Sequence, residues 1–217
     1  MIVEQQDGTL VRGLPLPEGT VDAVRTVLDR IPGLAVQAFS ADGMHRIVDN
    51  DEMRRHFAPE KARPIPGGFD RLPAILYKIL LSGPESDLLA ARSLLENAMP
   101  GRLAVTRSSD TLLDVMRAGT DKGEAARFLK AKLDAIRPIV LFTAAGDHEN
   151  DLGLLQEADF AFAMGQAPDI VKQAADVVLP DHSTPCLPAV IGQIRRILEV
   201  SSMPYRTPTE SEKILES

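Results

Sequence analysis

The pattern of apolar and polar positions divides the first half of the chain into alternating helices and strands. Apolar residues recur at helical spacing, or follow a helix-start signal, over 20–31, 51–57 and 84–98. Asn50 is a candidate cap for the second of these helices. Alternating or continuous apolar runs predict strands over 34–39, 44–48, 74–81, 103–106 and 112–116. Asp7-Gly8 is a favoured tight-turn dipeptide flanked by alternating residues, so residues 1–12 are expected to form a hairpin.

The second half of the chain alternates strands and helices in the manner of a parallel α/β sheet. Strands are predicted over 139–144, 160–164 and 177–179. Helices are predicted after Lys122, from Leu152, and over 168–175 and 188–200. The tail, 201–217, is rich in Pro, Ser, Thr and Glu and is expected to be flexible.

Two carboxylates, Asp147 and Asp151, follow the predicted strand 139–144 at a spacing of four residues. Polar residues at the carboxyl end of a strand lie where open α/β sheets bind ligands. Two carboxylates in such a turn can hold a hard divalent cation through oxygen, with water completing the coordination. An Asx-rich turn that caps the next helix explains the same spacing, and the spacing alone does not separate the two interpretations.

Composition and charge exclude several classes of function. The 217 residues carry a net charge of −7 with no basic stripe, which argues against a nucleic-acid partner. No apolar run approaches the ~20 residues that cross a membrane, and no basic-then-apolar leader opens the sequence. The single cysteine, Cys186, cannot form an internal disulfide. A cytoplasmic protein without a membrane partner is therefore expected.

Residues 146–179 read GDHENDLGLLQEADFAFAMGQAPDIVKQAADVVL. This segment resembles the last catalytic motif of the haloacid dehalogenase (HAD) phosphohydrolase superfamily, and most of all its Cof-type, IIB-capped branch. The matching residues are Gly146, Asp147, Asn150, Asp151, Leu155, Ala163 to Gly165, Ala167, Val171, Lys172, Ala175 and Asp176. Gln166 stands where the family usually has Asn, and His148 stands where it usually has a small residue.

The resemblance implies phosphoryl transfer through an aspartyl-phosphate with Mg²⁺ as cofactor. Lys122, in the sequence DKG, matches the family's third motif and takes its lysine role; a solvated surface lysine is the alternative. Asp147 is implied as a metal ligand, and Asp151 as a metal ligand or a neighbour of one. Asn150 is implied to contact the phosphoryl group or a metal-bound water.

The family's nucleophile motif has no full counterpart in this sequence. The DGTL of residues 7–10 matches the end of the motif DxDGT, but this alignment places Gln5 at the nucleophile position, and an amide cannot attack phosphorus as a carboxylate does. Ser40 is a candidate for the second motif in one alignment, while in another both early motifs are missing. The nucleophile carboxylate is absent in both.

The resemblance also implies an α/β fold in two parts. Residues 1–116 are expected to form an α+β cap of the IIB type with a leading hairpin, and 117–200 the C-terminal part of a HAD-like Rossmannoid core. Arg107 and Ser108, on the late cap strands, are weaker candidates for substrate contacts, and ordinary polar strand ends explain them equally.

The expected function is hydrolysis of a phosphomonoester, a sugar phosphate or another small phosphorylated metabolite. The isolated chain is expected to be inactive, because the nucleophile is absent. A non-catalytic phosphate- or sugar-binding module, a subunit that needs a complementing chain, and a purely structural protein are the alternatives. Without the nucleophile strand, strand 139–144 would leave an open edge, so a homo-oligomer or a complementing chain is expected.

Overall fold

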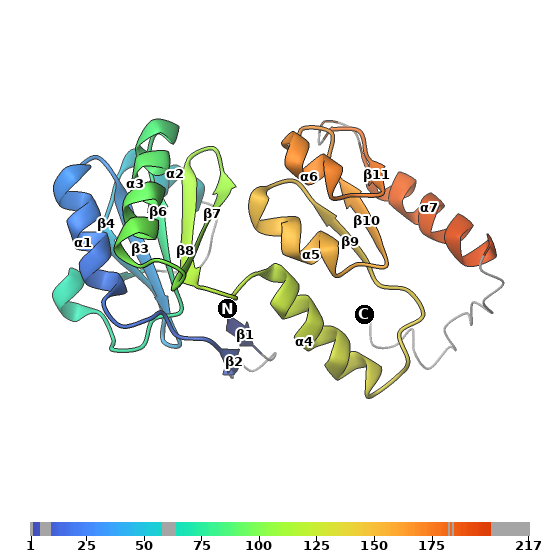
Figure 1. The fold of residues 1–217 in the computed structure, drawn as a ribbon, viewed down its shortest axis with the longest axis horizontal. Helices are drawn as coiled ribbons and strands as arrows, with labels where there is room; N and C mark the ends of the chain where they lie inside the picture. Colours follow the sequence, from blue (N-terminus) through green and yellow to red (C-terminus); the bar gives the residue numbers. More distant parts are fainter. Residues whose placement is uncertain (1, 5–9, 58–63, 182, 184, 201–217) are drawn as a thin grey trace.

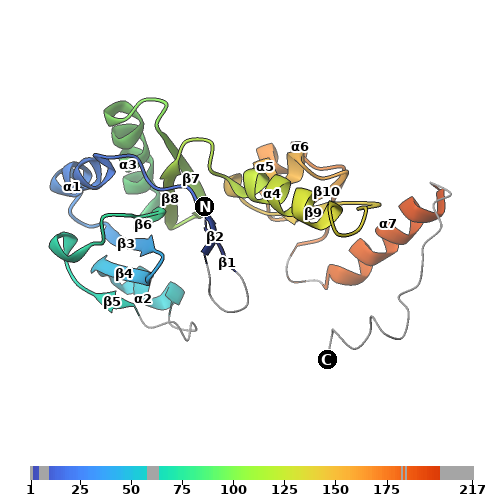
Figure 2. The same cartoon turned by 90° about the horizontal axis from the view of Figure 1, so that it is seen from below.

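The computed structural model describes residues 2–4, 10–57, 64–181, 183 and 185–200, which form two bodies side by side (Figures 1 and 2). The N-terminal body is built on a six-stranded sheet and the C-terminal body on a three-stranded sheet. The chain passes from one body to the other just before helix α4 (Lys122–Asp134). The predicted tail 201–217 lies outside the described residues. Within the described chain, no helix is both long and apolar enough to cross a bilayer.

The six-stranded sheet has the order β5-β4-β3-β6-β8-β7, and its neighbours are antiparallel except for the parallel pair β4 and β5. Its strands are β3 (Ala35–Ser40), β4 (Gly43–Val48), β5 (Ile65–Pro66), β6 (Lys78–Ser82), β7 (Leu103–Ser109) and β8 (Leu112–Arg117). Its helices are α1 (Thr20–Arg30), α2 (Asp51–Phe57), the short 3₁₀ turn η1 (Phe69–Arg71) and α3 (Glu85–Ala98).

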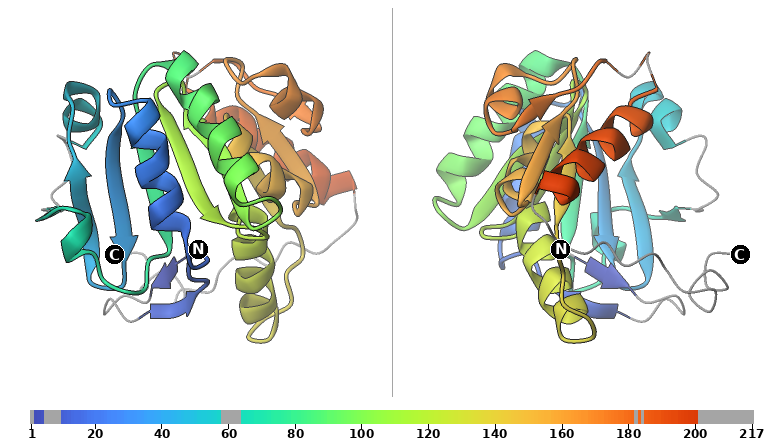
Figure 3. Two further views of the ribbon diagram at one scale, coloured as in Figure 1. Left: turned by 60° about the vertical axis from the view of Figure 1, so that its left-hand side comes forward. Right: turned by 90° about the vertical axis from the view of Figure 1, so that its right-hand side faces the viewer.

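Helices α1 and α3 cover one face of this sheet (Figure 3, left). Their apolar stripes, including Val24, Val27, Leu88 and Leu95, are buried against the strand residues on this face of the sheet, such as Val36 and Leu113. The other face is packed by α2, whose fully buried Met53 contacts Ala35, Leu80 and Leu112. Because side chains alternate along a strand, Lys78 and Asp114 share this second face with Leu80 and Leu112.

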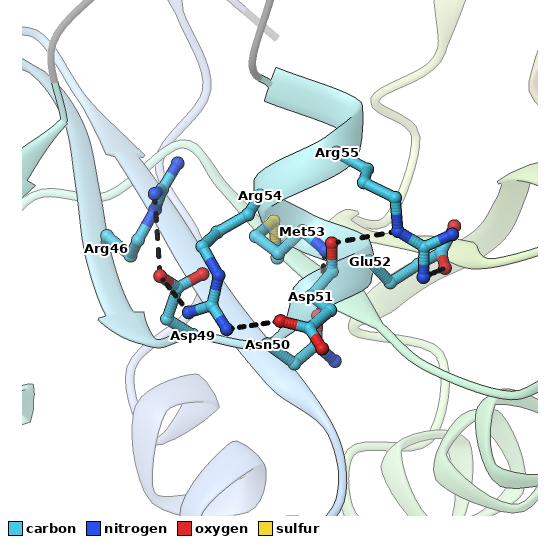
Figure 4. Close-up of polar contacts among 8 residues, drawn as sticks. All are labelled: Arg46, Asp49, Asn50, Asp51, Glu52, Met53, Arg54 and Arg55. Atoms are coloured by element: carbon cyan, nitrogen blue, oxygen red, sulfur yellow. Dashed lines mark hydrogen bonds and ion pairs between the residues drawn. The ribbon is translucent and has the colours of Figure 1, made fainter.

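Helix α2 begins at the cap that the sequence predicts. Asn50 Oδ1 accepts a hydrogen bond of 2.8 Å from the Met53 N–H, which satisfies one of the free amides of the first turn. Around it, Arg54 pairs with Asp49 at 2.9 Å and with Asp51 at 2.6 Å (Figure 4). Asp49 also pairs with Arg46, and Arg55 pairs separately with Glu52. Exposed pairs of this kind contribute little, so buried Met53 is the main anchor of α2.

The three-stranded sheet is parallel, with the order β11-β10-β9. Its elements are α4, β9 (Thr143–Gly146), η2 (Glu149–Asp151), α5 (Leu152–Gln156), β10 (Phe160–Ala163), α6 (Asp169–Gln173), β11 (Val177–Val178) and α7 (Leu187–Val200). A small core joins β9, β10, α5 and α6, in which Leu155 and Val171 pack with the alanines of β9 and β10. The carboxyl ends of β9 and β10 therefore lie at one edge of the sheet.

Two predicted strands are shorter than their apolar runs. Strand β9 begins at Thr143 rather than Ile139, because its partner β10 begins at Phe160, opposite Thr143. The preceding run lies outside the ladder: Val140 is 58% exposed, and the Phe142 N–H donates to Asp159 Oδ2 at 2.8 Å. Likewise β6 begins at Lys78, so 74–77 are not strand.

The N-terminal hairpin is a separate two-stranded sheet, β1 (Ile2–Glu4) with β2 (Leu10–Gly13). Its predicted turn at Asp7-Gly8 lies outside the described residues. Arg12 ties the hairpin to α4, with Nη2 2.6 Å from a Glu124 carboxylate oxygen and the guanidinium 5.1 Å from the Phe128 ring centroid. The hairpin does not join the three-stranded sheet of the C-terminal body, since in the described chain β9 pairs only with β10.

Candidate functional site

An ion pair between Lys122 and Asp151 joins the start of α4 to the turn after β9. Asp121 caps α4, with Oδ1 accepting a 2.7 Å hydrogen bond from the Glu124 N–H, so that Lys122 is the first helical residue. A lysine there opposes the helix dipole. Lys122 Nζ donates to Asp151 Oδ1, which supplies the anion that this placement needs.

Asp151 is buried, with 4% of its surface exposed. Its Oδ2 accepts the backbone N–H groups of Asp147 at 3.0 Å and His148 at 3.2 Å, so one carboxylate holds both Lys122 and the turn. Burial alone would raise the pKa of Asp151. The hydrogen bond and charge of Lys122 and the two amides outweigh it, and the pKa is lowered from 3.8.

Three glycines let the backbone approach closely enough to form this pair. A Cβ on Gly123 would lie 2.5 Å from the Gly153 carbonyl oxygen, and a Cβ on Gly153 would lie 2.9 Å from the Asp121 carboxylate. A Cβ on Gly146 would lie 2.5 Å from Asp151 Cβ. Gly123 and Gly153 thus bring α4 against α5, and Gly146 lets Asp151 fold back on the end of β9, so that Lys122 lies beside Asp151.

Asp147 lies at the carboxyl end of β9 with its side chain 40% exposed. Its carboxylate contacts His148 Nδ1 at 2.8 Å and accepts a long hydrogen bond of 3.5 Å from Gln166 Nε2. Gln166 follows β10, so the two parallel strands deliver these side chains to the same sheet edge.

A cavity of about 570 Å³ lies between the two bodies beside this edge. Lys122 and Asn150 line it from the C-terminal body, and Lys78, Thr106 and Asp114 line it from the six-stranded sheet. Asn150 Oδ1 is buried there without a hydrogen-bond partner in the protein.

A second cavity, of about 440 Å³, is lined by Asp147, His148 and Gln166 on one side and by Arg107 on the other. Arg107 is held by Glu85 at 2.7 Å and Asp110 at 3.0 Å. Glu149 lines both cavities and pairs across the two bodies with Arg92 of α3 at 3.1 Å. Ser108 is partly exposed and lines neither cavity.

The structure therefore brings the four main predicted residues to one sheet edge, divided between two adjoining cavities. Lys122 and Asn150 line the first cavity and Asp147 lines the second. Asp151 connects them through its bonds to Lys122 and to the Asp147 amide.

The oxygen donors at this edge suit a hard cation such as Mg²⁺. The half-exposed Asp147 carboxylate and the unpartnered Asn150 Oδ1 are available, whereas both oxygens of Asp151 are engaged. Among the described residues, no group of three or more His, Cys, Asp or Glu side chains is placed to hold a metal ion. These residues thus fit part of a magnesium site, and substrate, water or a further carboxylate has to complete it.

Sequence reasoning missed the residues that line the first cavity from the six-stranded sheet. Lys78 and Asp114 occur within strongly apolar strands, and a charged residue in such a strand was the available signal. Thr106 gave no signal, because threonine is common in strands. The contacts of His148 and Gln166 with Asp147 were also missed, although both positions depart from the family pattern.

Comparison with known proteins places this geometry in a family. The family model described as haloacid dehalogenase-like hydrolase matches residues 2–187. A Haemophilus influenzae protein described as a phosphatase is 30% identical over 173 residues, which are 78% of this chain and 64% of that protein. A 5-amino-6-(5-phospho-D-ribitylamino)uracil phosphatase of Bacillus subtilis is 38% identical over 76 residues, 35% of this chain and 30% of that protein. The chain thus spans under two thirds of the length of these relatives.

Solved structures show the same fold. A sugar phosphatase of HAD subclass IIB superposes with a TM-score of 0.72 at 17% identity, covering 86% of this chain and 70% of that one. A Streptococcus mutans protein superposes with a TM-score of 0.71 at 19% identity, covering 87% and 71%. The predicted α/β fold with a Rossmann-like core and a cap is confirmed at the level of this fold.

Proposed function

The chain belongs to the family of haloacid dehalogenase-like hydrolases, and we propose that it binds a small phosphomonoester, such as a sugar phosphate, and takes part in its hydrolysis. The observation that carries the proposal is the Lys122–Asp151 pair beside Asp147, at a cavity lined by both bodies. In this proposal residues 1–116 act as the cap and 117–200 as the C-terminal part of the core. The single Cys186 suits a reducing, cytoplasmic setting.

Lys122 is proposed to bind the phosphoryl oxygens. Its side chain is 50% exposed and it has three N–H donors, so donors remain after the bond to Asp151. Asp151 positions Lys122 and the Asp147–His148 backbone. Asn150, whose Oδ1 is free of protein partners, lies on the same wall and contacts the bound phosphoryl group or its hydration.

Asp147, with Asn150 beside it in the turn, is proposed to hold Mg²⁺. When bound, the cation neutralises phosphoryl charge, which is the main requirement of phosphoryl transfer. The chain's own residues then orient the phosphate: Lys122 from the helix start, and the turn 147–151 from the end of β9. Arg107, fixed by Glu85 and Asp110, lines the cavity next to Asp147 and is a weaker candidate for contact with the substrate.

Turnover by these 217 residues alone is proposed to be negligible. The alignment of DGTL puts an amide, Gln5, at the position of the attacking carboxylate, although Gln5 lies outside the described residues. This same feature favours the second candidate function, binding of a phosphorylated metabolite without chemistry. A carboxylate supplied by another polypeptide would restore the first candidate function, hydrolysis.

The proposal is tested by binding and turnover measured together on the purified chain. We expect inorganic phosphate with Mg²⁺ to shift the backbone NMR signals of Lys122 and 147–151. Asp147→Asn should weaken the dependence of phosphate binding on Mg²⁺. Hydrolysis of p-nitrophenyl phosphate should stay at background. Absence of phosphate binding at millimolar concentration would refute the assigned site, whereas magnesium-dependent hydrolysis at ordinary enzymatic rates would refute only the expected inactivity.

A further inference from the structure

The wall of the first cavity that the six-stranded sheet supplies carries an ion pair in apolar surroundings. Lys78 Nζ lies 2.7 Å from Asp114 Oδ1, and the Asp114 side chain is only 5% exposed. The Lys78 ammonium also lies 5.3 Å from the Phe39 ring centroid. The Lys78 side chain is 32% exposed, so only Asp114 is buried. A pair with a buried carboxylate is weak evidence for stability, because well-packed apolar residues of similar volume are often as stable or more stable. A reason outside folding is therefore needed for charges at these two positions.

Both walls of the cavity present polar atoms without protein partners. Thr106 Oγ1, two strands from Lys78, and Asn150 Oδ1 on the opposite wall are buried and accept or donate no hydrogen bond within the protein. Asp114 Oδ1 contacts Lys78 as an ion pair but lacks hydrogen-bond geometry. Because buried polar groups are normally bonded, these atoms indicate a ligand that both donates and accepts hydrogen bonds.

Cations are not in excess among the described residues around the cavity. Lys78 is matched by Asp114, Lys122 by Asp151, and Glu149 by Arg92, while Asp121 lines the cavity as a further carboxylate. Among the described residues that line this cavity, no cation lacks a carboxylate partner. A second anionic group on a bound ligand would therefore meet the Asp114 carboxylate beside Lys78, whereas a hydroxyl can donate to Asp114 and accept from Lys78 at once.

We propose that Lys78, Asp114 and Thr106 form a subsite that selects an uncharged, hydroxyl-bearing leaving group and rejects one that carries a carboxylate or second phosphate. This inference rests on the proposed function, since it assumes that the phosphoryl group lies at Lys122 across the cavity. The three side chains contact the leaving group and not the reacting phosphorus, so they are determinants of specificity.

The test compares two phosphorylated six-carbon chains that differ in one group. Glucitol 6-phosphate ends in an alcohol and 6-phosphogluconate ends in a carboxylate. Titration calorimetry of the full chain with Mg²⁺ should give roughly tenfold tighter binding of glucitol 6-phosphate, the scale of one well-placed hydrogen bond to a charged group. Inorganic phosphate, titrated in parallel, reports the Lys122 side of the cavity alone.

The variant Asp114→Asn removes the carboxylate, keeps the shape and leaves Lys78 unmatched. We expect it to reverse the preference toward 6-phosphogluconate while phosphate binding stays unchanged. Asp29→Asn, the same charge change at an exposed position of α1, should leave the preference intact. Thr106→Val, close to isosteric, should weaken glucitol 6-phosphate binding even if Asp114→Asn fails to fold.

The outcomes separate the two claims. Equal binding of both sugars by the wild-type chain, with phosphate still bound, would overturn the subsite and leave the proposed function standing. An unchanged preference in folded Asp114→Asn would do the same. Failure of the chain to bind phosphate at all would overturn both.

Discussion

At the scale of single residues, Asp151 is the carboxylate on which the site depends. It accepts two backbone N–H bonds and the Lys122 ammonium while almost fully buried. Asp151→Asn should lower the free energy of unfolding by about 1–3 kcal/mol, because hydrogen bonds to a buried charge are lost. Most of that loss belongs to the amides, since half-exposed Lys122 is screened by solvent. Urea denaturation measures it, and a loss no greater than that of Asp29→Asn would contradict it.

Because the pKa of Asp151 is lowered, its contribution to the free energy of unfolding changes with pH in a known direction. Burial opposes the shift, but Lys122 and the amides of Asp147 and His148 prevail, so the folded pKa lies below the ordinary value of 3.8. The stabilisation is therefore complete above the unfolded pKa and is lost as pH falls below 3.8 through the folded pKa. The difference in unfolding free energy between wild type and Asp151→Asn should shrink in that acidic range. A difference that grows with acidity would show the shift to have the opposite direction.

At the scale of elements, the approach of α4 to α5 through glycine decides where Lys122 lies. Gly123→Ala would place a Cβ 2.5 Å from the Gly153 carbonyl oxygen, which is backbone and cannot rotate away. We expect a loss of about 1–3 kcal/mol in unfolding free energy from this overpacking, against the usual helix preference for alanine. Phosphate binding should weaken as well, because the helix start must shift.

The matched control for that change lies in α7. Gly192 is also helical, but a Cβ there would meet nothing within 4 Å. Gly192→Ala should therefore stabilise the chain by about 0.5–1 kcal/mol, the ordinary helix propensity difference. Thermal or urea unfolding of the two variants side by side distinguishes close approach from propensity; equal effects would contradict the packing argument.

At the scale of the whole molecule, the outer edge of β9 is the feature that calls for a partner. Within the described residues β9 has a strand neighbour on one side only, and Ala145 on it is exposed. An open edge of this kind offers N–H and C=O groups to another chain. We therefore propose that the edge is covered by a second copy or by a polypeptide that carries the family's early motifs.

Light scattering at micromolar concentration should show association of the purified chain. Ala145→Lys places a charge on the edge strand and should shift the population toward the 23.5 kDa monomer. Ala90→Lys, at an exposed position of α3, adds the same charge away from that edge and should leave the distribution unchanged. A wild-type chain that is monomeric under these conditions would refute a second copy as the partner and leave the separate polypeptide.

The sequence by itself determined the local elements and the chemical identity of the candidate site. Helical periodicity and caps, such as Asn50 at α2, depend on neighbours within a few residues, so they can be read from the sequence. The spacing of Asp147, Asn150 and Asp151 after an apolar run was likewise sufficient to place them at the carboxyl end of a strand, where the structure has them. Lys122 was identified through family resemblance.

Only the tertiary structure decided which partners these residues have. Asp151 is engaged by Lys122 from 29 positions earlier, a pairing set by glycine contacts between helices that no periodicity encodes. The limits of β9 were set by where β10 begins, so the apolar run 139–142 was misassigned as strand. Lys78, Thr106 and Asp114 share one wall because strand register brings them together across β6, β8 and β7. Such contacts depend on how distant segments pack, and the physical reason they escape sequence analysis is that local patterns carry no information about sheet order and register.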